Sequence, residues 1–275
     1  MTLQVKFWGT RGSIPSPGKA TLRYGGNTSC VEVLYGNHSL IVDGGTGIRL
    51  LGKSLSRKSR KPVSILISHT HMDHIAGIPF FAPALNNGRS IRIYGPPGLK
   101  KSLQHLFPFP RLQSKKTIFE IKPRSFRISP FTVDCRWVNH PGGSLGYKIR
   151  TPGGHSVVYI SDHEPVTYCR HGSWAPSDRE MIQWIDRPDL LIMDAQYFEA
   201  EYKKRKGWGH SSLSYTVRLA LQSGARKLCL FHHDPNHSDP MLKRKLAHAL
   251  EIINREGGRI SCSLSQEGTT ITLSP

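Results

Sequence analysis

The stretch LISHTHMDHIAG, Leu66 to Gly77, places three histidines and an aspartate within six residues, directly after an apolar run that predicts a buried strand. In an extended segment, side chains two residues apart point the same way, so His69 and His71 can bind one metal ion together. Asp73 and His74 come where the chain turns into the next helix, and we expect them to point toward a second ion. Imidazole and carboxylate ligands suit zinc, with manganese or iron as alternatives. The spacing disfavours the other interpretation, a set of surface histidines beside a strand.

Further ligand-type residues stand at the ends of other predicted strands. Asp43 ends an apolar strand and precedes a glycine-rich turn, while His140 and Asp162 each follow a strand of their own. The pair His232-His233 follows another apolar run. Any one of these residues could be a buried, hydrogen-bonded polar group. Their shared position at strand ends is what a site built on one rim of a sheet requires.

Predicted strands and helices are mixed in both halves of the chain. The predicted strands are 3–7, 30–35, 39–42, 63–67, 91–94, 118–121, 132–138, 145–149, 157–160, 190–193 and 227–231. A capping box at Ser177 opens one helix, Ser211 or Ser212 caps a second, and Ser238 precedes a third, long one. This order predicts two sheets packed face to face, with helices outside.

The composition favours one domain. The chain has 275 residues, 37% of them hydrophobic, and no Gly/Ser- or Pro-rich linker divides it, so we predict a single domain over residues 1–275. No signal-peptide pattern and no run of about 18 apolar residues occurs, so neither secretion nor a membrane is expected. Scattered cysteines without a C-x-x-C pair predict reduced core residues and a cytoplasmic protein. They are Cys30, Cys135, Cys169, Cys229 and Cys262.

The charge is strongly positive. Lys and Arg number 38 against 19 Asp and Glu, which gives a formal net charge of +19. Such a field attracts an anionic substrate or nucleic acid, although any single basic cluster can equally be a solubilising surface. The clusters are Arg57-Lys58 to Arg60-Lys61, Lys100-Lys101, Lys115-Lys116, Lys203 to Lys206 and Lys243 to Lys245.

The motif His69-Thr-His71-Met-Asp73-His74 resembles the H-x-H-x-D-H signature of the metallo-β-lactamase superfamily. The strand-end residues match its remaining motifs in order, so the resemblance covers nearly the whole chain. The segments 7–15 and 24–29, and Gly207-Trp-Gly-His210-Ser211-Ser212, are similar to the ribonuclease Z-like phosphodiesterase branch. The resemblance implies an α/β fold, a four-layer αββα sandwich of two mixed sheets flanked by helices. It also implies a dinuclear site for two divalent metal ions, usually zinc.

The family's functional residues carry over position by position. The resemblance assigns His69, His71 and His140 to the first metal, Asp73, His74 and His232 to the second, and Asp162 to both. Asp43 would orient a ligand imidazole. His232 aligns better than His233, which is the fallback. The catalytic residues implied are Asp73 and His210, and the implied substrate contacts are His210, Ser211 and Asn27.

This assignment predicts metal-dependent phosphodiester hydrolysis. Two ions about 3.5–4 Å apart lower the pKa of a bridging water, and the resulting hydroxide would attack phosphorus. His210 would stabilise phosphate charge or protonate the leaving oxygen, the alternative being a simple capping-region histidine. The predicted substrate is a cyclic nucleotide, another small phosphodiester or RNA. Only residues 141–161 separate His140 from Asp162, an interval too short for the substrate-holding arm that ribonuclease Z often carries there.

Two other functions remain open. The same metal site permits carbon-centred hydrolysis of a lactone, thioester or β-lactam, whereas the +19 charge and His210 favour phosphate. Flavodiiron-type oxidoreduction is disfavoured, because those relatives carry a glutamate-containing pattern and a flavin domain. A non-catalytic nucleic-acid-binding protein is disfavoured because every expected ligand is present. The sequence does not decide the natural substrate, whether the protein forms a homodimer, or the role of the basic segment Lys100–Arg127.

Overall fold

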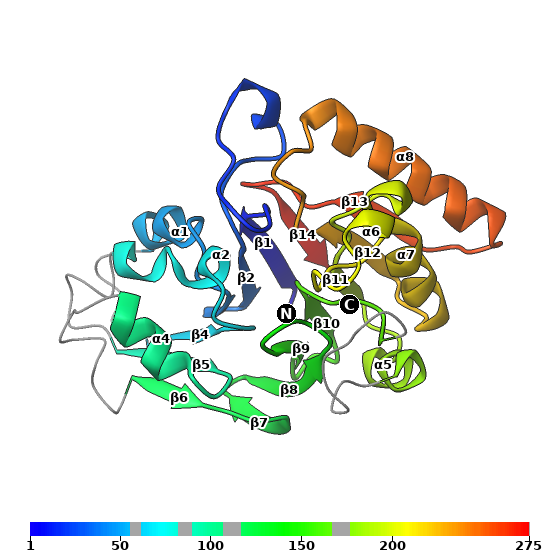
Figure 1. Cartoon of the computed structure of the whole chain (residues 1–275). Coiled ribbons are helices and arrows are strands. Elements are labelled where there is room, and N and C mark those ends of the chain that lie inside the picture. The colour runs from blue at the N-terminus through cyan, green and yellow to red at the C-terminus, as the bar shows by residue number, and fades with distance from the viewer. Residues whose placement is uncertain (56–61, 82–89, 107–116, 167–176, 275) are drawn as a thin grey trace.

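The computed structural model describes residues 1–55, 62–81, 90–106, 117–166 and 177–274. Two seven-stranded sheets pack face to face, and helices cover the outer face of each (Figure 1). The first sheet has the order β14 (Thr270–Leu273), β1 (Leu3–Gly9), β2 (Cys30–Tyr35), β3 (His38–Val42), β4 (Val63–Leu66), β5 (Ile91–Gly95) and β6 (Ile118–Glu120). The second has the order β13 (Ser261–Leu264), β12 (Lys227–Phe231), β11 (Leu190–Asp194), β10 (Ser156–Ile160), β9 (Ser144–Arg150), β8 (Phe131–Val138) and β7 (Arg124–Ile128).

Alternating side chains create the layers. In β10, Val157 and Tyr159 belong to the core between the sheets, whereas Val158 and Ile160 face the helices. The helices outside the first sheet are α1 (Ile48–Ser54), α2 (Met72–Ile75) and α4 (Leu99–Leu106). Those of the second half are α5 (Asp178–Ile185), α6 (Glu199–Lys204), α7 (Leu213–Gln222) and α8 (Asp239–Arg255). The predicted αββα sandwich is confirmed. Among the described residues, no helix has both the length and the hydropathy that crossing a bilayer requires.

Both sheets are mixed. Strands β3 to β6 are parallel to one another, and so are β10 to β13, while the remaining pairs are antiparallel. In a parallel sheet the carboxyl ends of the strands meet at one edge, where α/β proteins bind their ligands. The parallel halves therefore bring residues that are distant in sequence to the same rim.

The predicted strands are all present, with ends that differ by at most two residues, and three strands were missed. The missed strands are β7, β13 and β14. The helix caps behave as predicted at Ser177, whose hydroxyl accepts from Glu180 N while the Glu180 carboxylate accepts from Ser177 N. Ser212, not Ser211, caps α7, because its side chain accepts from Tyr215 N. Ser238 is the N-cap of α8.

Some predictions fall outside the described residues. They are the basic clusters at 57–61 and 115–116, and Cys169. The other four cysteines are free thiols, three of them buried. The single domain over residues 1–275 stays a prediction.

Candidate metal centre

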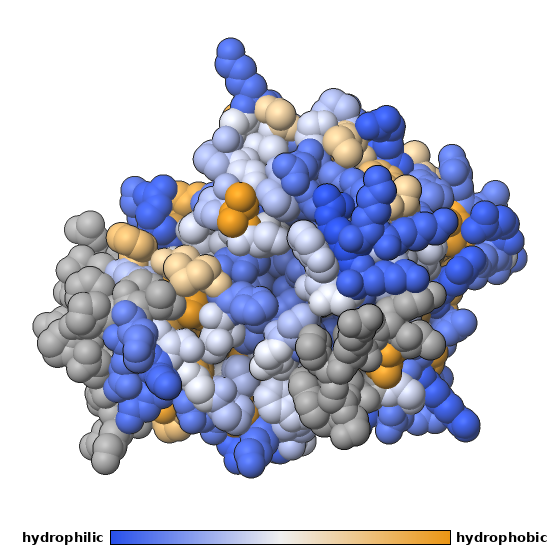
Figure 2. All heavy atoms as spheres, in the orientation of Figure 1, coloured by the Kyte–Doolittle hydropathy of each residue, from blue (hydrophilic) through white to orange (hydrophobic). Residues whose placement is uncertain are grey.

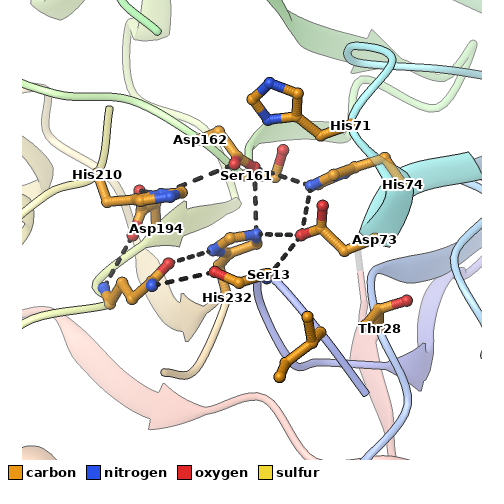
Figure 3. A network of polar contacts seen from close by, with 12 residues as sticks. Ser13, Thr28, His71, Asp73, His74, Ser161, Asp162, Asp194, His210 and His232 are labelled. Carbon is orange, nitrogen blue, oxygen red and sulfur yellow. Dashed lines mark hydrogen bonds and ion pairs between the residues drawn. The ribbon is translucent and has the colours of Figure 1, made fainter. Parts of the chain in front are cut away.

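The predicted site residues meet at the carboxyl ends of the strands. Asp43 follows β3, His69 comes three residues after β4, and His232 directly follows β12. Asp162 comes two residues after β10, which is parallel to β11 and β12. Asp73 and His74 lie in α2, the short helix that begins as the chain leaves the β4 end. The rim predicted from the strand ends therefore exists (Figure 3).

Two groups of three residues can be distinguished. Ligand atoms of His69, His71 and His140 lie within 4.8 Å of one another, as do those of Asp73, His74 and His232. In the first group, His140 Nε2 is 3.1 Å from His71 Nδ1. In the second, Asp73 Oδ2 is 3.1 Å from His232 Nε2 and 3.2 Å from His74 Nε2.

Asp162 lies between these groups. Its Oδ1 is 3.1 Å from His74 Nε2 and 3.4 Å from His232 Nε2. Its Oδ2 is 3.7 Å from His69 Nε2 and 3.8 Å from His140 Nε2. Burial raises the pKa of Asp162, but the surrounding histidines outweigh this and hold that pKa well below its usual range. The carboxylate thus turns one oxygen toward each group.

The imidazoles are oriented by hydrogen bonds on their far sides. His74 Nδ1 donates to Asp43 Oδ2 at 2.7 Å, His140 Nδ1 to Gly209 O at 2.8 Å, and His232 Nδ1 to Gln196 Oε1 at 2.8 Å. Each Nδ1 carries the proton, so each Nε2 offers a lone pair to the cluster. Metal-binding histidines in proteins are held in this way.

Buried polar atoms of the cluster fit a metal ion. Among the described residues, His69 Nε2, His74 Nε2 and Asp162 Oδ1 are buried without a hydrogen-bond partner. An unpaired buried polar atom typically costs about 1–3 kcal/mol. Metal coordination would remove this cost for all three atoms, and imidazole with carboxylate is a donor set that divalent zinc, manganese and iron accept. The cluster is therefore suited to metal binding.

Asp43 is held by several groups. Its carboxylate also accepts from Ser68 N at 2.7 Å and from Tyr159 OH at 2.7 Å. The residue has a left-handed φ of 62°, which turns its side chain back toward β4 and His74. It contacts an imidazole and lies behind the cluster.

The two neighbouring histidines after β12 have different surroundings. His232, with a φ of 57°, points into the cluster. His233 donates through Nε2 to Ser265 O at 2.9 Å and lies away from Asp73 and Asp162. Of the two alternatives that the sequence left open, His232 is therefore the one brought to the site.

His210 approaches the cluster from the α6–α7 connection. Its Nδ1 is 3.1 Å from Asp194 Oδ2 and 3.7 Å from Asp162 Oδ2. Burial lowers the pKa of His210, but the carboxylates of Asp194, Asp162 and Asp73 outweigh it and raise this pKa to about 9. Ligand atoms of His210 also lie within 4.8 Å of those of two pairs of residues, Asp162 with His140 and Asp194 with His232.

The sequence did not predict three residues that support the cluster, two through their side chains and one, Ser13, through its backbone N–H. Asp194 is fully buried at the end of β11 and accepts from His210 Nδ1 and Ser211 N. Its signal was available, a carboxylate at the end of an apolar strand. Gln196, on His232, and Ser13, whose N donates to Asp73 Oδ2 at 2.7 Å, carry no comparable local signal.

The two other predicted substrate contacts are engaged within the protein. Ser211 is buried and its hydroxyl donates to His163 O at 2.6 Å. The Asn27 amide donates to Glu267 Oε2 at 2.9 Å. Their role toward a substrate stays a prediction.

An open pocket of about 370 Å³ gives access to the cluster. Figure 2 shows a hollow at the middle of the face drawn, and hydrophilic residues gather in it. The residues that line the pocket are Ser13, Thr70, His71, Met72, Asp73, Asp162 and His210.

Comparison with known proteins identifies the family. A family model described as the beta-lactamase superfamily domain matches residues 38–233, more than two thirds of the chain. The chain belongs to the metallo-β-lactamase superfamily. The ribonuclease Z of Exiguobacterium sp. strain AT1b is 24% identical over 272 residues, which cover 84% of this chain and 88% of that protein. The relationship to ribonuclease Z is thus distant.

Solved structures agree on the fold. The metallo-β-lactamase fold protein YhfI from Bacillus subtilis superposes with a TM-score of 0.73 at 22% identity, covering 99% of both chains. A diphosphatase from the PhnP family superposes with a TM-score of 0.72 at 18% identity, covering 99% of this chain and 98% of its own. The chain is thus a hydrolase of the metallo-β-lactamase fold with a histidine–aspartate metal-binding cluster.

A buried carboxylate supports the turn before His210 in this metallo-β-lactamase domain. Glu164 is fully buried and accepts from Gly207 N at 2.7 Å, Gly209 N at 2.7 Å and Tyr202 OH at 3.0 Å. Both glycines have positive φ, 86° and 90°. The carbonyl oxygen of Gly209 in this turn accepts a hydrogen bond from His140 Nδ1.

We expect Glu164→Gln to lower the free energy of unfolding by about 1–3 kcal/mol. An amide nitrogen cannot accept, so one backbone N–H of the turn loses its partner. Denaturant unfolding measures the change, and Glu251→Gln, on the exposed face of α8, is the matched control. Equal stability of the two variants would contradict the role given to Glu164.

Proposed function

We propose that this chain is a dinuclear metal-dependent phosphodiesterase acting on a cyclic nucleotide, another small phosphodiester or RNA. The observation that carries the proposal is His210. It belongs to neither histidine–aspartate group, yet it lines the pocket and its Nδ1 lies 3.7 Å from Asp162 Oδ2. A histidine in that position suits the stabilisation of phosphate oxygens or of a leaving alkoxide.

The proposed ligands have distinct positions around Asp162. They are His69, His71 and His140 for the first ion, Asp73, His74 and His232 for the second, and Asp162 for both. Two divalent ions, with zinc favoured over manganese and iron, would supply a water that is nucleophilic at neutral pH and a clamp on the phosphate oxygens. Asp73 lines the pocket, and its carboxylate would also orient the attacking water.

His210 would act through Nε2. Asp194 accepts a hydrogen bond from His210 Nδ1, so the other ring nitrogen is left for the substrate. From there it would stabilise charge on a phosphate oxygen or donate a proton to the leaving oxygen. Asp194 therefore serves as the positioning residue for His210.

The charge of the protein supports an anionic substrate. A net charge of +19 draws anions toward the molecule and raises their encounter rate. The relatives named as ribonuclease Z and as a PhnP-family diphosphatase support phosphorus over carbon as the reacting centre. Hydrolysis of a lactone, thioester or β-lactam is the alternative on the same residues. We infer a cytoplasmic location because the four cysteines among the described residues are free thiols.

A substrate screen tests the proposal. The zinc- and manganese-loaded protein is incubated with bis-p-nitrophenyl phosphate, cyclic nucleotides, RNA and a set of lactones. We expect hydrolysis of at least one phosphodiester and its loss on chelation. Turnover confined to lactones, or salt-sensitive RNA binding without any hydrolysis, would refute it.

A further inference from the structure

The last turn of α6 and the residues that follow it form a basic segment, Lys203–Trp208, that ends in an exposed tryptophan. Lys203, Lys204 and Lys206 are exposed, and Trp208 is 61% exposed. Figure 2 shows strongly hydrophilic residues gathered over α6, beside the hollow. Trp is highly buried on average. Here the exposed indole and the exposed lysines together place an aromatic face next to positive charge, where a ligand outside the chain can reach both.

The backbone holds Trp208 firmly in place. Glu164 accepts from the amides of both flanking glycines, and Trp208 N donates to Arg205 O at 3.1 Å. The exposure of the indole is therefore a property of a fixed turn, not of a loose loop. Because the backbone is already ordered, only the side-chain torsions of Trp208 remain to be fixed when a ligand binds the ring.

Contacts between side chains link Trp208 to the metal centre. The Arg205 guanidinium lies 6.0 Å from the Trp208 ring and 5.0 Å from the Tyr197 ring. The Tyr197 ring in turn meets the His210 ring edge-on, with centroids 5.8 Å apart. Two side chains, Arg205 and Tyr197, thus connect Trp208 to His210, which lines the pocket.

We propose that the Lys203–Trp208 segment binds single-stranded nucleic acid, with a base stacked on Trp208 and phosphates held by Lys203 and Lys204. Proteins that bind single-stranded nucleic acid combine aromatic side chains with basic ones in this way. Every base can stack on an aromatic ring, and every phosphodiester linkage carries a negative charge that a lysine can neutralise. Arg205, beneath the ring, adds a cation–π contact. The inference rests on the proposed phosphodiesterase function and narrows its substrate to one that contains nucleotides.

A second basic cluster on the same molecule provides the contrast. Lys243 and Arg244 are exposed on α8 and carry the same charge as the lysine pair. No described aromatic ring is exposed next to them in sequence, so we interpret that pair as a solvated helix face. Substituting either pair changes the net charge equally.

Binding is measured by fluorescence anisotropy with the metal-loaded protein. The probe is a labelled phosphorothioate hexanucleotide, which resists hydrolysis, and its partner is the same backbone without bases. Trp208→Ala should weaken binding of the base-containing probe by roughly 5- to 150-fold and that of the abasic probe by less than about twofold. Trp208→Phe, which keeps a ring, should recover most of the affinity.

The salt dependence of Kd distinguishes direct phosphate contacts by Lys203 and Lys204 from the general effect of the protein's positive charge. Lys203→Ser/Lys204→Ser should reduce the slope of log Kd against log salt by about 1.4, roughly 0.7 for each phosphate that a lysine no longer neutralises. Lys243→Ser/Arg244→Ser should leave the slope unchanged. The proposal is overturned if Trp208→Ala affects both probes alike or neither, or if the two charge variants give the same slope.

Hydrolysis of methyl p-nitrophenyl phosphate is measured in parallel on the wild type. Absence of hydrolysis of this ester and of every phosphodiester in the substrate screen would refute the proposed function, while the anisotropy data would still decide whether Trp208 stacks a base. The two proposals can therefore fail independently.

Discussion

Asp162→Asn is expected to lose both metal ions and essentially all hydrolytic activity. The two oxygens of Asp162 face different groups, Oδ1 toward His74 and His232 and Oδ2 toward His69 and His140. An amide keeps the shape of the side chain but loses the negative charge and one of the two oxygens. Because each proposed metal site depends on this residue, both should weaken at once.

Asp43→Asn is the matched comparison. It makes the same change in a carboxylate that is equally buried, yet Asp43 contacts the cluster only through His74 Nδ1. Removing such a supporting hydrogen bond typically costs about 10–100-fold in metal affinity or activity. The loss for Asp162→Asn should exceed that range. Elemental analysis after dialysis against increasing chelator concentrations measures the metal content of both variants. Equal metal content would contradict the ranking.

The sequence predicted the metal cluster because its signal is local. Each ligand-type residue follows an apolar strand, and parallel strands end at one rim, so position along the chain indicates position in space. The same rule would have found Asp194, which ends β11. Gln196 and Ser13 could not be found this way, because their contacts depend on how separate loops meet.

The resemblance favoured His232 over His233, but the local sequence pattern alone does not distinguish the two residues. Both residues follow the same strand, and the left-handed φ of His232 decides which ring enters the cluster. That conformation depends on partners supplied by distant segments, Gln196 for His232 and Ser265 for His233. The packing of these distant segments therefore determines the conformation of His232.

The missed strands have a different cause. Strands β13 and β14 have four residues each and contain serine or threonine at alternate positions. Pairing with β12 and β1 at the sheet edges stabilises them, which a local pattern does not reveal. The layers could be predicted from the longer strands because these alternate or are continuously apolar.

His210→Ala is expected to keep both metal ions and to lower kcat about 10²–10⁴-fold, the usual contribution of general acid catalysis. His210 is held by Asp194, whereas the proposed coordination of both ions is complete without it. His210 is proposed to interact with the substrate mainly in the transition state, so kcat should fall more than KM rises. The half-buried His248, on α8, gives the control variant His248→Ala, which should retain wild-type metal content and rate.

The leaving group distinguishes the possible roles of His210. A p-nitrophenolate needs little protonation, so the loss should be small on p-nitrophenyl esters and large on alkyl esters if His210 is the acid. If His210 stabilises only the phosphate oxygens, both ester types should lose similar amounts. If it is a ligand, as its distances to Asp162 and His140 allow, metal content should fall together with activity. If it only supports the α6–α7 connection, activity per bound metal should stay near wild type. Metal content and kcat on both ester types separate these four results, and retained metal with a leaving-group-dependent loss is the one we expect.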